Sequence, residues 1–165
     1  MLQAVLFDFD GTLADTAADL SRALNRLRTA RRLPELPLEA LRPHASSGAR
    51  GLRWGIVTNK STKLTRMVVK ALGLEARTAC VVCGDTTPHL KPNPASLLYA
   101  AKELALAPQA CVYLGDDLRD VQAARSAGMS TVAVEWGYGE HPAGWQADAV
   151  IARPMDLLGY LALSP

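Results

Sequence analysis

Three aspartates, Asp8, Asp10 and Asp116, lie just after apolar runs of the chain. Carboxylates brought together at the ends of neighbouring strands repel one another unless a cation lies among them. Mg²⁺ favours oxygen ligands, with few carboxylates, several waters and a substrate phosphate. The group contains no cysteine or histidine, which excludes a typical zinc site. We therefore predict that these three aspartates bind Mg²⁺.

The same residues could carry out phosphoryl transfer. The Asp8 carboxylate is either a metal ligand or a nucleophile that forms an acyl phosphate. Asp10, two residues further on, could protonate a leaving alkoxide and then deprotonate the hydrolytic water. Thr58 and Lys91 could hold phosphate oxygens, one through its hydroxyl and the other through its full positive charge. Together they supply the positioning and charge neutralisation that phosphoryl transfer needs.

Each of these residues also has a plainer interpretation. Asp8 and Asp10 could form a solvated turn, because aspartate is a common turn residue. Lys91 could be a surface lysine, and Thr58 and Asn59 could cap the helix that follows them. Capping and phosphate binding are compatible, since a helix N-terminus attracts anions. We therefore include Asn59 among the phosphate-binding residues.

Alternating elements must position these side chains. Short apolar runs predict strands over 4–7, 54–58, 79–83, 111–114, 131–134 and a short 149–151, and helical patterns cover 16–32, 62–72, 95–106, 118–127 and 155–163. This order predicts an α/β fold, a three-layer Rossmann-like parallel sheet of five to six strands with helices on both faces. Right-handed crossovers place the carboxyl ends of the strands at one edge, where ligands bind. The candidate residues follow those strand ends.

Composition limits the class of protein. The chain has 165 residues, of which 49% are hydrophobic, and a net charge of +2. That balance argues against a broad nucleic-acid surface, and no apolar run is long enough to span a membrane. Carboxylates within the first ten residues are untypical of a signal peptide, and three cysteines fit a reduced protein. We expect a cytoplasmic protein that binds neither nucleic acid nor a membrane.

Four motifs, in order, resemble those of the haloacid dehalogenase-like (HAD) hydrolase superfamily. The run Asp8–Leu13 (DFDGTL) is similar to its first motif, Thr58 in IVTNK to its second, Lys91 in LKPNP to its third and residues 115–120 (GDDLRD) to its fourth. The flanking sequence is similar to phosphoglycolate phosphatases and to the related N-acetylmuramic acid 6-phosphate phosphatases. One motif alone would be weak, whereas the ordered set is specific.

The resemblance implies roles for individual residues. It implies that Asp8 is the nucleophile and Asp10 the general acid and base. It also implies that Mg²⁺ is held by the Asp8 side chain, the Asp10 backbone carbonyl and Asp116. Asp117 and Asp120 would orient the lysine of the third motif or metal-bound waters. A plainer interpretation of those two is that acidic residues favour a helix N-terminus.

The chain departs from the family at the cap. In phosphoglycolate phosphatases a helical cap is inserted between the first strand and the second motif, but here Thr58 follows Asp8 by only 50 positions. The body of the cap is missing, with a join near residues 50–52. We expect one HAD-like core domain over 1–165, with 33–52 as a cap remnant or connecting loop. The shortening could be natural, engineered or a gap in the sequence.

These observations predict a magnesium-dependent phosphomonoester hydrolase that works through an aspartyl phosphate. The expected substrate is a small phosphorylated metabolite, 2-phosphoglycolate first and an amino-sugar phosphate second. One alternative is a phosphomutase on the same scaffold, although a chain without a cap excludes water poorly. Another is a catalytically impaired core, natural or engineered. A homodimer through the uncapped face is a further expectation.

Overall fold

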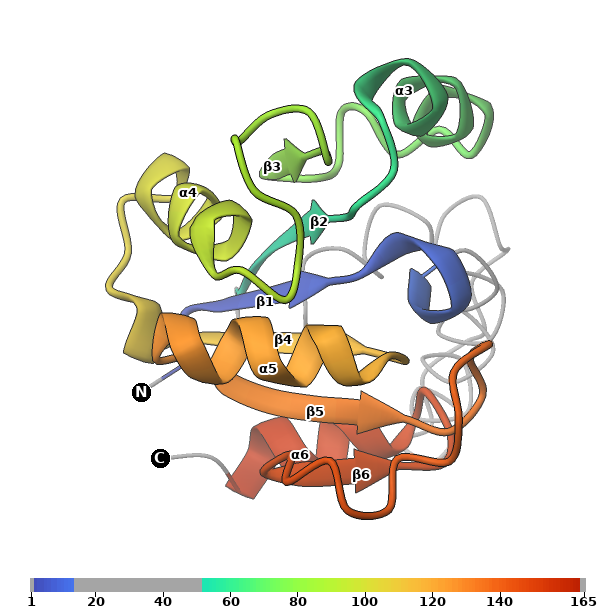
Figure 1. Ribbon diagram of the computed structural model, residues 1–165, viewed down its shortest axis with the longest axis vertical. Helices are drawn as coiled ribbons and strands as arrows, with labels where there is room; N and C mark the ends of the chain where they lie inside the picture. Colours follow the sequence, from blue (N-terminus) through green and yellow to red (C-terminus); the bar gives the residue numbers. More distant parts are fainter. Residues whose placement is uncertain (1, 14–51, 164–165) are drawn as a thin grey trace, which may run out of the picture.

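The computed structural model describes residues 2–13 and 52–163. Its centre is a six-stranded, all-parallel sheet in the order β3-β2-β1-β4-β5-β6 (Figure 1). The strands are β1 (Ala4–Phe7), β2 (Arg53–Val57), β3 (Cys80–Val82), β4 (Cys111–Gly115), β5 (Ser130–Val134) and β6 (Ala149–Ile151). The two strands that end in the candidate aspartates, β1 and β4, are direct neighbours at the centre.

Helices cover both faces of the sheet. The described helices are α3 (Thr62–Ala71), α4 (Ala95–Glu103), α5 (Leu118–Ala127) and α6 (Asp156–Leu163). Side chains alternate between the faces along each strand. In β1, Leu6 packs with residues of α4 and α5, whereas Val5 packs with Leu157 of α6. Val69 of α3 joins a third cluster with Ile56 of β2.

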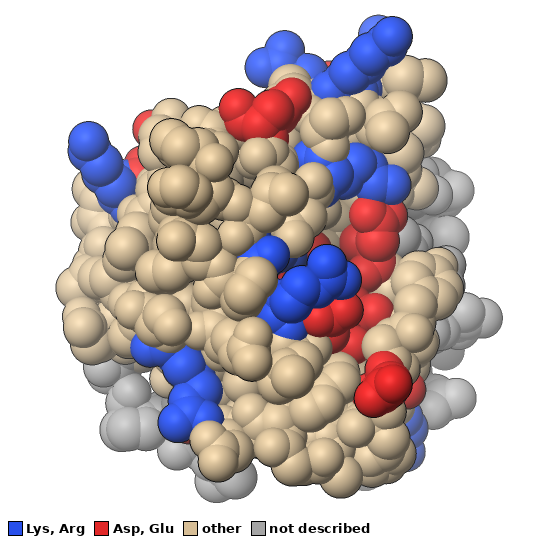
Figure 2. Space-filling model, viewed as in Figure 1, with Lys and Arg blue, Asp and Glu red and all other residues tan. Residues whose placement is uncertain are grey.

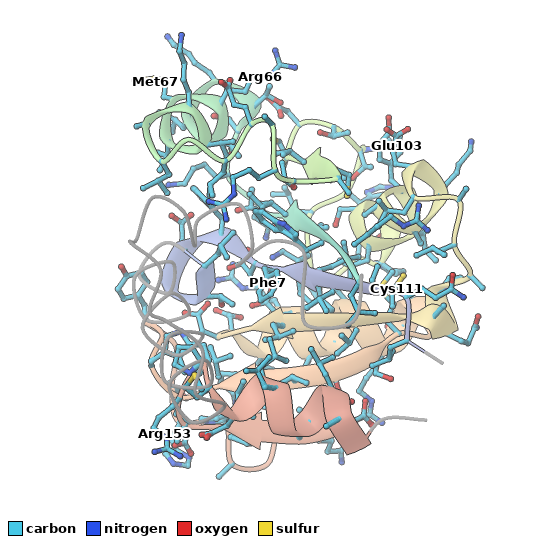
Figure 3. All side chains as sticks on the ribbon, turned by 180° about the vertical axis from the view of Figure 1, so that it is seen from behind. Phe7, Arg66, Met67, Glu103, Cys111 and Arg153 are labelled. Atoms are coloured by element: carbon cyan, nitrogen blue, oxygen red, sulfur yellow. The ribbon has the colours of Figure 1, made fainter. Side chains whose placement is uncertain are left out.

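The outer surface of the helices is solvated. Arg66 and Met67 lie on the outer side of α3, and 61% of Met67 is exposed, while Phe7 lies within the layers (Figure 3). None of the helices in the described ranges is long and apolar enough to cross a membrane.

The predicted fold class is confirmed: a three-layer parallel α/β sheet with six strands. Two elements, β3 and α4, are shorter than predicted by more than one residue. The strand β3 has three residues, and α4 ends at Glu103 because Ala105 adopts a positive φ of 51°. The predicted helix 16–32 and the segment 33–52, except for its last residue, lie outside the described residues.

All six strands point the same way, so their carboxyl ends meet along one edge of the sheet (Figure 1). After β1 the chain makes a tight turn over Phe9–Leu13. Gly11 in this turn has a φ of 77°, in the left-handed region that glycine adopts without steric cost. The turn brings the first motif back over the edge where β4 ends.

Candidate active site

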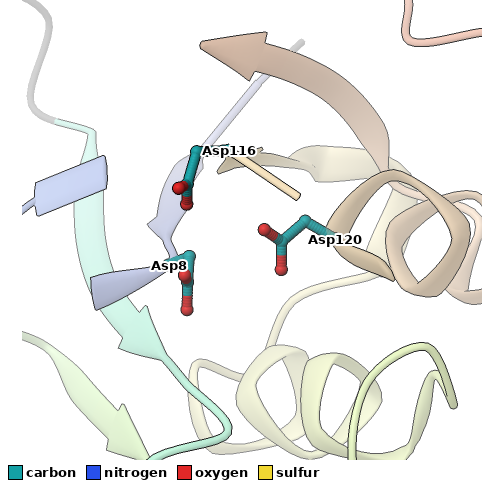
Figure 4. A group of neighbouring side chains, drawn as sticks. All are labelled: Asp8, Asp116 and Asp120. Carbon is teal, nitrogen blue, oxygen red and sulfur yellow. The ribbon is translucent and has the colours of Figure 1, made fainter. Parts of the chain in front are cut away.

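An acidic cluster occupies the carboxyl edge of the two central strands. Asp8 follows β1, Asp116 follows β4, and Asp120 lies in the first turn of α5. One carboxylate oxygen from each residue lies within 4.8 Å of the others. In Figure 4 the Asp8 and Asp116 side chains lie side by side, with Asp120 facing them. The parallel sheet thus joins residues more than a hundred positions apart in the sequence.

Lys91 is buried beside this cluster, with 4% of the residue exposed. Its ammonium donates to Asp8 Oδ1 at 2.8 Å and to Asp120 Oδ1 at 2.7 Å. It also donates to the Tyr113 hydroxyl at 2.7 Å and lies 3.2 Å from the carbonyl of Val57. The Tyr113 hydroxyl in turn donates to that carbonyl at 2.7 Å. One buried cation therefore lies between two buried carboxylates.

The pKa values in this group follow from burial and charge. Burial raises the pKa of Asp8 to about 6, although Lys91 opposes the shift and Asp120 adds to it. Burial also raises the pKa of Asp120, again against the effect of Lys91. For Lys91, burial lowers the pKa, but the two carboxylates outweigh it and the net shift is upward. The lysine therefore stays charged at neutral pH.

Asp116 is held from two sides. Its Oδ1 accepts a hydrogen bond from the buried Thr12 hydroxyl at 3.1 Å. Its Oδ2 accepts from the backbone N–H of Tyr138 at 2.8 Å. Thr12 belongs to the turn after β1 and Tyr138 to the loop after β5. Two loops far apart in the sequence therefore fix the orientation of one carboxylate.

Three glycines surround Asp116 at close range. A Cβ atom added to Gly11 or Gly137 would overlap the Asp116 side chain, and one on Gly139 would overlap its carbonyl oxygen. Real Cβ atoms are never so close to another heavy atom. The backbone can therefore approach Asp116 only where side chains are absent.

Asp10 lies at the mouth of the site, with 48% of its side chain exposed. Its Oδ1 forms an ion pair with Lys60 Nζ at 2.9 Å. Lys60 lies in the loop just after β2, the strand that pairs with β1. The exposed position leaves Asp10 in reach of solvent, as a residue that exchanges protons with water requires.

Thr58 and Asn59 connect β2 to the site. Thr58 is 2% exposed, and its hydroxyl oxygen accepts from the Lys60 N–H at 3.2 Å. The Asn59 side chain pairs with the backbone of Lys91: it accepts from the N–H at 2.9 Å and donates to the carbonyl at 3.1 Å. This pairing holds the loop that carries Lys91 against the end of β2.

A capping role for Thr58 and Asn59 is not observed. The N-cap of α3 is Ser61, whose side chain makes no capping bond. Asp85 accepts from the Thr62 N–H at 2.9 Å, so a residue distant in sequence caps this helix. The hydrogen bonds lower the pKa of Asp85.

The start of α5 separates two aspartates that look alike in the sequence. Asp117 is the N-cap, and its carboxylate accepts from the N–H of Arg119 at 2.8 Å. Asp120 accepts from the Asp117 N–H at 3.1 Å, which completes a capping box. Asp120 is buried against Lys91, whereas the Asp117 side chain is 37% exposed. Of these two aspartates, only Asp120 accepts a hydrogen bond from Lys91, the lysine of the third motif.

The predicted site residues line one pocket of about 550 Å³. In the space-filling view, acidic atoms lie in a hollow flanked by basic ones (Figure 2). The lining contains five carboxylates and three cations, which leaves a net charge of −2. The lining residues are Asp8, Asp10, Thr58, Asn59, Lys60, Lys91, Asp116, Asp117, Arg119, Asp120, Tyr138 and Gly139.

Comparison with known proteins agrees with this geometry. The model of the haloacid dehalogenase-like hydrolase family matches residues 48–134, more than half of the chain. The chain is 35% identical to phosphoglycolate phosphatase of Xanthomonas campestris pv. campestris (strain 8004), over 94% of each chain. It is 31% identical to N-acetylmuramic acid 6-phosphate phosphatase of Pseudomonas aeruginosa, over 97% of this chain and 95% of the relative. The chain belongs to the haloacid dehalogenase-like hydrolase family.

Within this family the chain is of the phosphatase type, a phosphoric monoester hydrolase. A crystal structure of a predicted phosphoglycolate phosphatase from Haemophilus somnus 129pt has the same fold, with a TM-score of 0.73 and 21% identity over 97% of this chain and 98% of that one. The alignments with the two curated relatives extend over 208 and 214 positions, more than the 165 residues of this chain. Those relatives therefore contain residues that have no counterpart here.

The donor set fits a divalent metal ion. The cluster of Asp8, Asp116 and Asp120 offers only oxygen atoms, the donors that Mg²⁺ prefers. The charge of Asp120 is paired with the Lys91 ammonium at 2.7 Å, whereas Asp116 accepts only from the neutral Thr12 hydroxyl and the Tyr138 N–H. The charge of Asp116 is therefore better available to a cation than that of Asp120.

Four residues that line the pocket or bond its lining residues were not predicted from the sequence. Thr12 lies in the first motif (DFDGTL) and Lys60 in the second (IVTNK), so their positions could have identified them as site residues. Arg119 also lies in a motif, but nothing local shows that it faces the pocket. Tyr113 is the fourth of these residues. It lies in an apolar strand, and no sequence pattern indicates that its hydroxyl bonds Lys91.

Proposed function

We propose that the chain is a magnesium-dependent phosphomonoesterase that transfers the phosphoryl group to Asp8. The observation that supports it most is the placement of the Asp8 carboxylate. It directly follows the central strand β1, lies 2.8 Å from a buried ammonium and lines an open pocket. A carboxylate so placed can attack a phosphorus atom whose oxygens Lys91 neutralises.

In the first step an Asp8 oxygen forms a bond to phosphorus while the bond to the ester oxygen breaks. Asp10 gives its proton to the departing alkoxide, and the product alcohol leaves. Asp10 enters this step protonated, and the ion pair with Lys60 holds the carboxylate that remains at the mouth of the pocket once the proton has left. Thr58 and Lys91 stay with the phosphoryl oxygens, and Asn59 fixes the Lys91 backbone.

In the second step a water molecule enters from the open side and attacks the phosphorus of the aspartyl phosphate. Asp10 accepts a proton from this water, as the same group that donated one in the first step. The bond between phosphorus and Asp8 breaks, inorganic phosphate leaves and the carboxylate is regenerated. Each residue thus returns to its starting state.

The charge of the pocket supports the metal requirement. A dianionic phosphate would enter a lining that already has a net charge of −2. A divalent cation held by Asp8, Asp116 and the Asp10 backbone carbonyl would offset that charge and polarise the phosphoryl group. Asp117 and Asp120 would act on the substrate only through other residues. Asp117 orients Arg119, and Asp120 orients Lys91.

We propose small phosphorylated metabolites as substrates, 2-phosphoglycolate first and an amino-sugar phosphate second. The relatives named above support both choices. We also propose that 1–165 is a single core domain whose cap is reduced to a remnant within 33–52, which the greater length of both alignments supports. A cytoplasmic location and a homodimer through the uncapped face stay predictions, and light scattering tests the latter.

The decisive experiment is a phosphate-release assay on a panel of phosphomonoesters, with Mg²⁺ and with EDTA. The Asp8→Asn variant keeps the shape of the side chain but removes the attacking carboxylate, so activity should fall by several orders of magnitude. Asp85→Asn is the matched control, because Asp85 caps α3 outside the pocket. Equal activity of Asp8→Asn and the wild type would exclude the proposed nucleophile. Mutase activity on a sugar phosphate would favour the phosphomutase alternative.

A further inference from the structure

Arg119 lies in the wall of the pocket but contacts none of the groups that act on the phosphoryl group in the mechanism above. Its side chain is 58% exposed. Its Nε donates to Asp117 Oδ1 at 2.9 Å and its Nη2 to Asp117 Oδ2 at 2.8 Å. The guanidinium is therefore held in one orientation by a two-point contact with the residue that caps α5.

This contact uses only one edge of the guanidinium. The group has five N–H donors in a rigid plane, and Asp117 accepts two of them. Its Nη1 donates to no residue in the described parts of the chain, so a second edge stays available. Exposed ion pairs of this kind contribute little to stability. The arrangement therefore presents an oriented cationic edge at the pocket rather than a structural support.

The position in the chain places this edge near the reacting groups. Asp120, the next residue, bonds Lys91, which bonds Asp8. Asp8, Lys91 and Arg119 line the same pocket. When the phosphate of a substrate lies between Asp8 and Lys91, a second anionic group of that substrate would therefore face Arg119. A guanidinium edge matches the two oxygens of a carboxylate.

We propose that Arg119 is a specificity-determining residue that binds a second anionic group of the substrate, a carboxylate in particular. The inference rests on the proposed function and narrows its substrate class to small phosphomonoesters of carboxylic acids. Asp117 is then a positioning residue, because it orients the guanidinium without touching the substrate.

The test compares 2-phosphoglycolate with ethyl phosphate, which has similar size but no carboxylate, on the full chain with Mg²⁺. Arg119→Met should lower kcat/KM for 2-phosphoglycolate about tenfold more than for ethyl phosphate, mostly through KM, as expected for the loss of a charged hydrogen bond. Arg119→Lys should recover part of the difference. Equal losses on both substrates would mean that Arg119 acts on the transferred phosphate, and no loss on either would remove it from the site.

The chain offers a matched control. Arg153, labelled in Figure 3, forms the same kind of contact with Asp156 at the start of α6, through Nε and Nη2. It is not among the residues that line the pocket. Arg153→Met should leave both rates unchanged. The double change Arg119→Met with Asp117→Asn removes both charges. This double variant should still discriminate poorly between 2-phosphoglycolate and ethyl phosphate. A return of the wild-type discrimination would mean that Arg119 merely neutralises Asp117.

Failure of the inference can be separated from failure of the proposed function. If the wild type hydrolyses no ester of the phosphate-release panel, the proposed function is wrong, and calorimetric binding of 2-phosphoglycolate and ethyl phosphate in the presence of Mg²⁺ then tests Arg119 alone. Tighter binding of 2-phosphoglycolate that Arg119→Met abolishes supports the inference. Equal affinities for both esters in the wild type overturn it.

Discussion

Two lysine–aspartate contacts in this protein have nearly the same length but very different burial. Lys91 Nζ lies 2.8 Å from Asp8 and 2.7 Å from Asp120, and the Lys91 side chain is 3% exposed. Lys60 Nζ lies 2.9 Å from Asp10, with 26% of the lysine and 48% of the aspartate side chain exposed. The same substitution, lysine to methionine, should therefore have very different costs at the two sites.

Lys91→Met removes the only described cation between two buried carboxylates. Breaking a buried pair from one side costs about 3–5 kcal/mol, because the remaining charge is uncompensated. An exposed pair such as that of Lys60 contributes about 0–1 kcal/mol. At about 2–4 °C per kcal/mol for a domain of this size, Lys91→Met should lower Tm by roughly 6–20 °C and Lys60→Met by at most a few degrees.

Chemical denaturation of both variants in EDTA measures this difference, since EDTA prevents Mg²⁺ from replacing the lost charge. Asp120→Asn should cost less in the Lys91→Met background than in the wild type, because it then removes an unpaired charge. A Lys91→Met variant that fails to fold while Lys60→Met folds agrees with the argument. A free energy of unfolding for Lys91→Met within about 1 kcal/mol of that for Lys60→Met would refute it.

Four further outcomes are expected. Gly137→Ala displaces the Asp116 side chain, so a Mg²⁺ titration of phosphate release should show weaker activation and a maximal rate at least about tenfold lower. EDTA should abolish phosphate release, and Mg²⁺ should raise the Tm of the wild type but not of Asp116→Asn. Asp85→Ala removes the cap at Thr62 and should lower Tm slightly, by calorimetry, without changing activity. Burial raises the pKa of Cys80 to about 11, so its alkylation, followed by mass spectrometry, should keep accelerating with pH up to that value; a plateau near pH 9 would contradict it.

The fold was predictable because its pattern is local. Apolar runs that alternate with helical periodicity define a parallel sheet with helices on both faces, and the structure has six such strands. A parallel sheet places all carboxyl ends at one edge, so residues that follow strands must lie together. That rule was sufficient to place Asp8, Thr58 and Asp116 around one pocket, whereas Lys91, in the long loop after β3, was indicated by its motif.

The details of the site depended on contacts that no local pattern encodes. Motif order predicts the same role for Asp117 and Asp120, but the start of α5 turns Asp117 to solvent and buries Asp120 against Lys91. Tyr113 lies among apolar residues of β4, and only the strand alternation and the neighbouring β1 and β2 bring its hydroxyl to the ammonium. The cap of α3 comes from Asp85, 23 residues beyond Thr62.

Residue types and their order by themselves determined the class of chemistry here: carboxylates, a hydroxyl and a lysine at successive strand ends. The tertiary structure alone decided how those charges are shared. Asp8 and Lys91 are 83 positions apart, and whether their contact is a buried pair or a solvated one depends on how much of each side chain the packed layers cover. Burial sets the strength of every charge interaction in the site, and burial is a property of the whole fold.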